Sequence, residues 1–87
     1  MSNEDALLKL RIVKRLNNLA VYYGNVETSI YNKVALVNFC FEMYMLDVVT
    51  LNFFEDFVAW VVPERMEDLC GMTMTEYRNR RNAINEK

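Results

Sequence analysis

The chain contains no histidine, only two glycines and a single proline. Without histidine there is no ordinary general base near neutral pH, no Ser-His or Cys-His pair, and no histidine-containing zinc site. The phosphate-binding loops GxGxxG and GxxxxGK[ST] need more glycine than this chain has. Paired acids such as Glu55 and Asp56 could act in acid-base catalysis, but their spacing is also that of a solvated helix face. The sequence therefore predicts a protein that is not an enzyme and has no cofactor and no metal.

Cysteine is scarce as well, with Cys40 and Cys70 as its two examples. Both lie within apolar helical patterns rather than in a CxxC motif, which predicts reduced, buried thiols in a reducing compartment. Cys70 directly precedes a glycine at an expected helix C-terminus, where the helix dipole opposes a thiolate. The N-terminus shows no secretory signal pattern, and no uncharged run approaches the roughly 18 to 20 residues needed to span a bilayer. We therefore expect a soluble, cytoplasmic protein.

What the chain does have is apolar surface in excess. Its 87 residues correspond to a single domain, 1–87, and 53% of them are hydrophobic, above the usual ~45 to 50%. A chain this short buries its apolar side chains incompletely, so some of them should be exposed. An exposed apolar patch usually marks an interface, whereas a core rich in Met and Phe is the alternative explanation.

The scarcity of glycine and proline favours helices throughout, and the pattern of apolar residues predicts an all-α compact bundle of four to five helices. The expected helices are Glu4–Tyr23, Val26–Leu46, a third from Asp47 or Thr50 to Val62, Pro63–Cys70 and Met74–Asn85. Their expected core positions are Leu8, Ile12, Leu16, Leu19 and Tyr23 in the first; Ile30, Val34, Val37, Phe41, Tyr44 and Val48 in the second; Phe53, Phe54, Phe57, Val58 and Val61 in the third; and Tyr77 and Ile84 in the last.

Capping signals place the helix ends. Ser2 with Asp5, and Thr73 with Glu76, have the spacing of capping boxes. Gly24 and Gly71 stand where a left-handed residue ends a helix, and Asn25 stands where it would cap the second helix. In the third helix Glu55, Asp56 and Ala59 are expected to point outward.

The second helix has apolar residues on two sides. Besides its core face, Phe39, Met43 and Leu46 fall among polar residues, and Trp60 and Met45 are expected nearby. Aromatic residues and methionine are enriched in interface cores. We therefore predict a protein interface at Phe39, Met43, Leu46 and Trp60, either in a homodimer or with another protein; the alternative is that these residues belong to the core.

The segment Pro63–Lys87 resembles a helix-turn-helix, because a short helix and a glycine-containing turn precede a helix that bears basic residues. This resemblance implies that Arg78, Arg80 and Arg81 contact DNA. Two positions depart from the motif: Glu67 stands where a small residue is usual, and Arg80 stands at a later apolar anchor position. An ordinary helical hairpin with a solvated basic tail is the alternative.

Charge is distributed unevenly along the chain. Residues 1–33 hold five basic and three acidic side chains, residues 34–76 one and eight, and residues 77–87 four and one. Arg11, Lys14 and Arg15 of the first helix would join the C-terminal arginines in one basic patch if the first and last helices lay side by side, and that patch would suit phosphates or an acidic protein surface. Alternatively, the basic ends neutralise the acidic middle within the molecule.

Together these features predict a non-catalytic binding protein that occupies a macromolecular surface, most simply that of a protein. Its size and lack of catalytic chemistry suit a regulator, adaptor or inhibitor of the kind that phages and mobile elements encode. The alternative function is a nucleic-acid-binding regulator that uses Pro63–Lys87. No membrane association is expected.

Overall fold

The computed structural model describes residues 3–85, and these form an all-α fold of five α-helices and one 3-10 turn, without strands. The elements are α1 (Asn3–Asn25), α2 (Ile30–Met45), α3 (Leu51–Val61), the 3-10 turn η1 (Pro63–Arg65), α4 (Met66–Cys70) and α5 (Met74–Asn85). The predicted fold class is confirmed, including the short C-terminal hairpin of α4 and α5.

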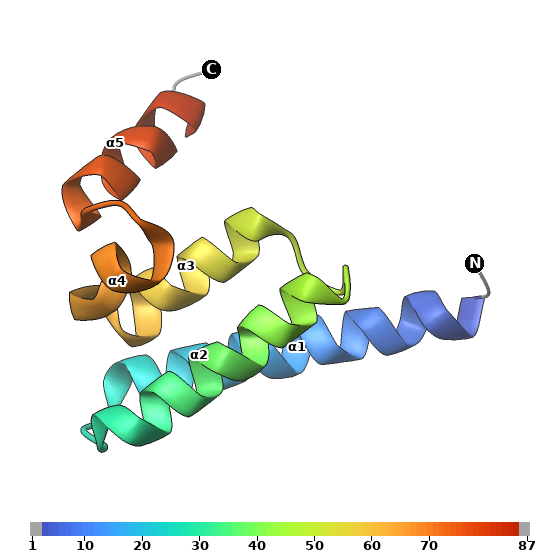
Figure 1. The fold of residues 1–87 in the computed structure, drawn as a ribbon. Coiled ribbons are helices and arrows are strands. Elements are labelled where there is room, and N and C mark those ends of the chain that lie inside the picture. The colour runs from blue at the N-terminus through green and yellow to red at the C-terminus, as the bar shows by residue number, and fades with distance from the viewer. Residues whose placement is uncertain (1–2, 86–87) are drawn as a thin grey trace.

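Helices α1 and α2 form an antiparallel hairpin, and α3 contacts both of them (Figure 1). Helix α3 runs in the same direction as α1, and α5 lies on the side of α3 away from α1 (Figure 1). The N-terminal turns of α1 extend past the end of α2 (Figure 1). One long helix therefore has two different halves: its C-terminal half contacts α3, and its N-terminal half projects from the fold.

The hydrophobic core lies where α1, α2 and α3 meet, and it continues under α4. Its buried members are Leu16, Ala20, Val37, Cys40, Val49, Phe54, Phe57, Val58, Val61, Val62, Met66 and Met72. Phe54, Phe57, Val58 and Val61 confirm the predicted buried face of the third helix, with Phe53 half-buried beside them. This short helix supplies much of the core because the other helices surround it.

Local capping chemistry fixes the start of α3, the end of α4 and the start of α5 as predicted, whereas the predicted helix Pro63–Cys70 begins as the 3-10 turn η1 and becomes α-helical only at Met66. The Thr50 hydroxyl accepts a hydrogen bond from the backbone N–H of Phe53 at 3.1 Å, which starts α3. Gly71, at φ 70°, ends α4 in the left-handed conformation that glycine adopts readily. Thr73 Oγ1 accepts from the Glu76 N–H at 3.1 Å while Glu76 Oε1 accepts from the Thr73 N–H at 3.2 Å, which completes a capping box.

The predicted boundary between the first two helices is wrong. Helix α1 continues through Gly24 to Asn25, whose side-chain amide donates to the carbonyl of Val21 at 2.8 Å. Helix α2 begins only at Ile30, and its cap is Ser29 rather than Asn25, because Ser29 Oγ accepts from the N–H of Asn32 at 3.4 Å. Gly24 allows α3 to approach α1 closely, and it does not reverse the direction of the chain.

Burial also departs from the predicted pattern at several positions. Leu8, Ile30 and Phe41, predicted in the core, are exposed, although the Phe41 ring still lies 5.4 Å from that of Phe54, centroid to centroid. Glu55, predicted to point outward, is only 8% exposed because α5 covers that side of α3. Ser2 and the side chain of Ile84 lie outside the described part of the chain.

Candidate functional site

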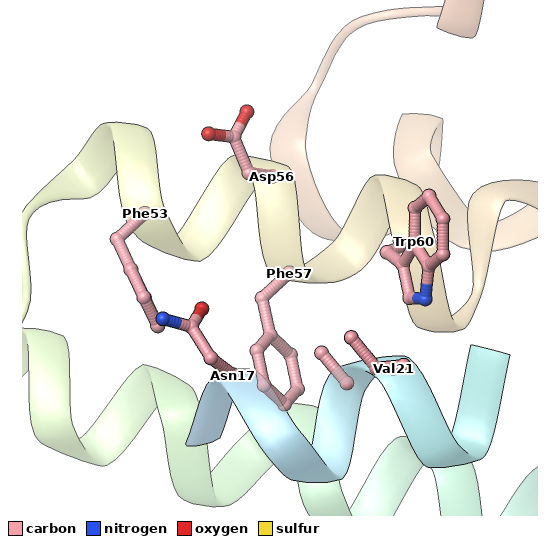
Figure 2. A pocket seen from close by; sticks show the side chains of 7 residues that line it. Asn17, Val21, Phe53, Asp56, Phe57 and Trp60 are labelled. Carbon is pink, nitrogen blue, oxygen red and sulfur yellow. The ribbon is translucent and has the colours of Figure 1, made fainter. Parts of the chain in front are cut away.

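A shallow groove of about 310 Å³ runs between α1 and α3 (Figure 2). Helix α1 contributes Asn17, Ala20 and Val21, and α3 contributes Phe53, Asp56, Phe57 and Trp60. Most of these side chains are apolar, and three are aromatic. A concave, largely apolar surface with few polar groups is the usual form of a binding site.

Close approach of α3 to α1 shapes one end of this groove. The indole of Trp60 lies directly against Gly24, where an added Cβ would collide with Nε1 and Cδ1 of the indole and lie 3.1 Å from the Trp60 carbonyl oxygen. Gly24 is the penultimate residue of α1, so it lies in the last turn of the helix. Here it makes room for a tryptophan that nevertheless stays 54% exposed.

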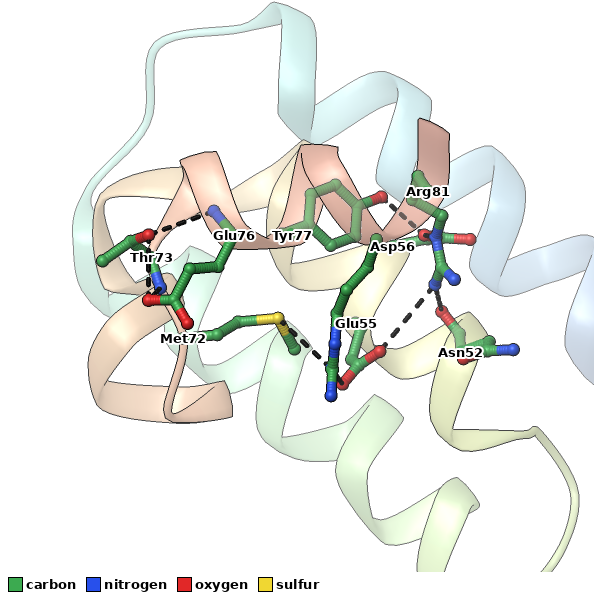
Figure 3. Close-up of polar contacts among 9 residues, drawn as sticks. Asn52, Glu55, Asp56, Met72, Thr73, Glu76, Tyr77 and Arg81 are labelled. Atoms are coloured by element: carbon green, nitrogen blue, oxygen red, sulfur yellow. Dashed lines mark hydrogen bonds and ion pairs between the residues drawn. The ribbon is translucent and has the colours of Figure 1, made fainter. Parts of the chain in front are cut away.

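The polar rim of the groove connects it to α5. Asp56 lines the groove, and its Oδ1 accepts hydrogen bonds from the Tyr77 hydroxyl at 2.5 Å and from Nε of Arg81 at 2.8 Å. Figure 3 shows Tyr77 and Arg81 reaching from α5 to this one carboxylate. Asp56 therefore belongs both to the groove and to the contact that holds the last helix.

Further contacts between α5 and α3 extend the contact at Asp56 into a network (Figure 3). Arg81 Nη2 donates to the carbonyl of Asn52 at 3.0 Å and lies 3.8 Å from Oε1 of Glu55. Arg80 Nη1 lies 3.8 Å from the other Glu55 oxygen, Oε2. The Arg81 guanidinium also lies 5.3 Å from the centre of the Tyr77 ring, within the range of a cation–π contact. The network pairs a nearly buried acid, Glu55, with two arginines.

The surroundings of Tyr77 and Arg81 favour the protonated forms of both side chains. Burial, and then the hydrogen bond to Asp56, raise the pKa of Tyr77 above its usual value. Burial lowers the pKa of Arg81, but hydrogen bonds to Asp56 and Tyr77 outweigh it and raise the pKa overall. Tyr77 therefore stays a neutral donor and Arg81 stays a cation across the physiological range.

The predicted interface residues lie on two separate surfaces. Phe39 and Leu46 are exposed on α2, together with Met45, as expected for an interface. Met43, four residues after Phe39, is half-buried and packs against the core. Trp60 lies against α1 in the groove and not beside Phe39.

The predicted basic residues do not form one patch. Arg11, Lys14 and Arg15 are exposed on α1, which lies on the opposite side of α3 from α5 (Figure 1). At the C-terminal end Arg80 and Arg81 pair with the acidic residues of α3, as in the neutralisation alternative. Arg78 is exposed on the same helix.

Neither cysteine is in a disulfide, and within the described residues no three His, Cys, Asp or Glu side chains come together as a metal site. Burial raises the pKa of the Cys40 thiol to about 12. Burial and the charge of Glu55 raise the pKa of Cys70 as well. Both thiols therefore stay protonated at neutral pH.

This protonation predicts slow thiol chemistry at Cys40. With Cys70 replaced by alanine, the remaining thiol should react with a disulfide reagent at pH 8 at least about a hundredfold more slowly than free cysteine, because so little thiolate is present. The same variant should react at the normal rate in denaturant, which serves as its control. Rapid labelling of the folded protein would show that Cys40 is accessible and ionised.

Sequence reasoning missed the groove itself, although it singled out Trp60. The available signal was the pair Ala20 and Gly24, two small residues four positions apart, which lie on one side of a helix. Small residues at that spacing allow another element to approach closely. Gly24 was instead interpreted as a helix end.

Within the described residues, no helix is both long and apolar enough to cross a membrane. No protein-family model, no curated protein and no solved structure matches this chain, so the geometry of the groove alone supports a function.

Proposed function

We propose that this chain is a non-catalytic binding protein that recognises a protein partner through the groove between α1 and α3. The observation that carries this proposal is a half-exposed tryptophan at the end of an apolar groove also lined by two phenylalanines. Tryptophan is among the residues that dominate binding energy at protein interfaces, and it does so when a partner desolvates it. The free, protonated thiols suit a cytoplasmic protein.

The shape and charge of the groove favour an amphipathic helix as its ligand. Two roughly parallel helices form a trough into which apolar side chains spaced by three or four residues can insert. The one charged lining residue is Asp56, which is paired with Arg81 but stays 54% exposed, so a polar or basic residue of the ligand can still contact it. A protein that binds a partner's helix in such a groove is suited to be a regulator, adaptor or inhibitor.

Nucleic-acid binding by α5 is the weaker alternative. Arg81 is directed to Asp56 and Asn52, and so is withdrawn from a phosphate backbone. Arg78 and Arg80 remain exposed on a helix that stands away from the α1–α2 hairpin (Figure 1). Two arginines would give at most a modest, strongly salt-dependent affinity for duplex DNA.

The test uses Trp60, the single tryptophan of the chain, as a reporter. Helical peptides selected from a display library against the folded protein should shift the Trp60 emission to shorter wavelength and protect it from acrylamide quenching. Val21→Lys, which places a charge in the groove, should weaken binding at least tenfold. Tyr22→Lys, at the adjacent exposed position that does not line the groove, is the matched control.

Equal affinity of the two variants for the selected peptides would place the binding surface elsewhere. Selection that yields no binder, together with salt-sensitive binding to duplex DNA that Arg78→Ala weakens, would favour the nucleic-acid alternative. Peptides that bind without changing Trp60 emission would also contradict the proposal.

A further inference from the structure

The projecting half of α1 carries apolar side chains that nothing in the fold covers. Leu10 is 50% exposed, and Leu7, one turn earlier, is exposed to a similar degree. Leu10, Asn17 and Val21 are separated by seven and four residues, so they lie on one side of the helix. Asn17 and Val21 line the groove. The uncovered leucines and the open groove are therefore successive parts of the same side of α1.

This arrangement is self-complementary. A twofold axis perpendicular to α1 and passing near Lys14 would place two α1 helices antiparallel, with Leu7 and Leu10 of each copy opposite the groove of the other. Such a contact is isologous, since each copy gives the same leucines and receives them in the same groove. We propose that a second copy of this chain occupies the groove in this way. This dimer proposal rests on the proposed function, because both take the groove as the binding site.

Charge supports this occupant. Asp56 is the one charged residue that lines the groove. Arg11, four residues after Leu7 and adjacent to Leu10, falls opposite Asn17 of the partner copy in the antiparallel register, on the side of the groove whose rim carries Asp56. Asp56 already binds Arg81 of its own copy, but its side chain stays 54% exposed and open to a second cation. The two copies of Lys14 meet near the axis, and their repulsion limits the affinity.

The available area predicts a reversible dimer. Leu7, Leu10, Val21 and Trp60 are each about half exposed. Their exposed surface amounts to roughly 400 Å² per copy, so a symmetric pair would bury on the order of 800 Å² of apolar surface, below the roughly 1,000 Å² expected of a stable interface and in the range of weak, transient contacts. We therefore expect a weak dimer that forms only at high protein concentration. A second copy and a partner helix would then compete for one groove, so self-association would regulate the binding site.

The experiment measures mass and Trp60 emission together over a wide range of protein concentration, using sedimentation and fluorescence on the full chain. The mass should rise from that of the 10.3 kDa monomer toward twice that value, and the emission should shift to shorter wavelength over the same range. Leu10→Asp should raise the dissociation constant at least tenfold. Leu8→Asp is the matched control, because Leu8 is 57% exposed on the same helix but on a different side. Circular dichroism verifies that both variants stay helical.

Three outcomes would overturn the inference: a monomer at every concentration, a dimer whose Trp60 emission does not change, or a dimer that Phe39→Asp abolishes and Leu10→Asp leaves intact. The last would place the contact on the exposed face of α2 instead. Failure of the proposed function is distinguishable, since Leu10→Asp keeps the groove intact. A selected helical peptide that shifts Trp60 in Leu10→Asp supports the groove as a binding site whether or not the wild-type chain dimerises.

Discussion

Leu16→Ala should lower the free energy of unfolding by about 3 kcal/mol, within the range of about 2 to 5 kcal/mol usual for a leucine removed from a core. Leu16 has no exposed surface and lies in the cluster where α1, α2 and α3 meet. Replacing it leaves a cavity that three helices must close at once. For a domain of this size, each kcal/mol lowers the melting temperature by roughly 4 to 8 °C. Urea unfolding followed by circular dichroism measures the loss.

Leu8→Ala makes the same chemical change two turns earlier on the same helix, at a side chain that is already exposed. It should alter the free energy of unfolding by less than about 0.5 kcal/mol in the monomer. A similar loss in both variants would mean that α1 is buried along its whole length, contrary to the projecting half that the structure shows.

Arg81→Ala should detach α5 and lower stability by about 2 kcal/mol, because it removes two charge-assisted hydrogen bonds and leaves a nearly buried Glu55 with a weaker counter-charge. Helix α5 is mostly polar, and among its described side chains Met74 and Tyr77 contact the core. The backbone amides of α5 should therefore exchange with solvent faster in this variant. Hydrogen exchange followed residue by residue separates this local release from global unfolding.

Arg78→Ala is the control on the same helix, since within the described part of the chain its side chain makes no hydrogen bond or ion pair, and it should change stability by less than about 0.5 kcal/mol. Arg81→Lys should lower stability less than Arg81→Ala does, but it should still be less stable than the wild type. The lysine ammonium lacks the planar, forked donor groups with which the guanidinium binds Asp56 and the Asn52 carbonyl together. Equal effects of Arg78→Ala and Arg81→Ala would show that α5 is held by its apolar contacts and not by this network.

Several features of the fold could be predicted because they depend on neighbours in the sequence. Thr50 with Phe53, and Thr73 with Glu76, form their hydrogen bonds within a few residues, so the starts of α3 and α5 followed from the sequence. Gly71 ends α4 for the same reason, since its conformation depends on its own backbone. The apolar face of α3 is continuous over its length, so its burial was predictable as well.

Positions that depend on distant partners were predicted wrongly. Glu55 has the local pattern of an outward residue, and its burial comes from arginines 25 and 26 residues later in the chain. Gly24 has the pattern of the residue after a helix end, whereas α1 includes it and ends at Asn25, and the Trp60 indole lies against it.

The sequence alone therefore determined the helical class, the starts of α3 and α5, the end of α4 and the excess of apolar surface, because periodicity, composition and capping act over a few residues. Only the tertiary structure decided where that apolar surface lies. The groove arises where two helices separated by 25 residues approach through Ala20 and Gly24. Helical periodicity identifies the faces of each helix, but it does not specify which face of one helix meets which face of another.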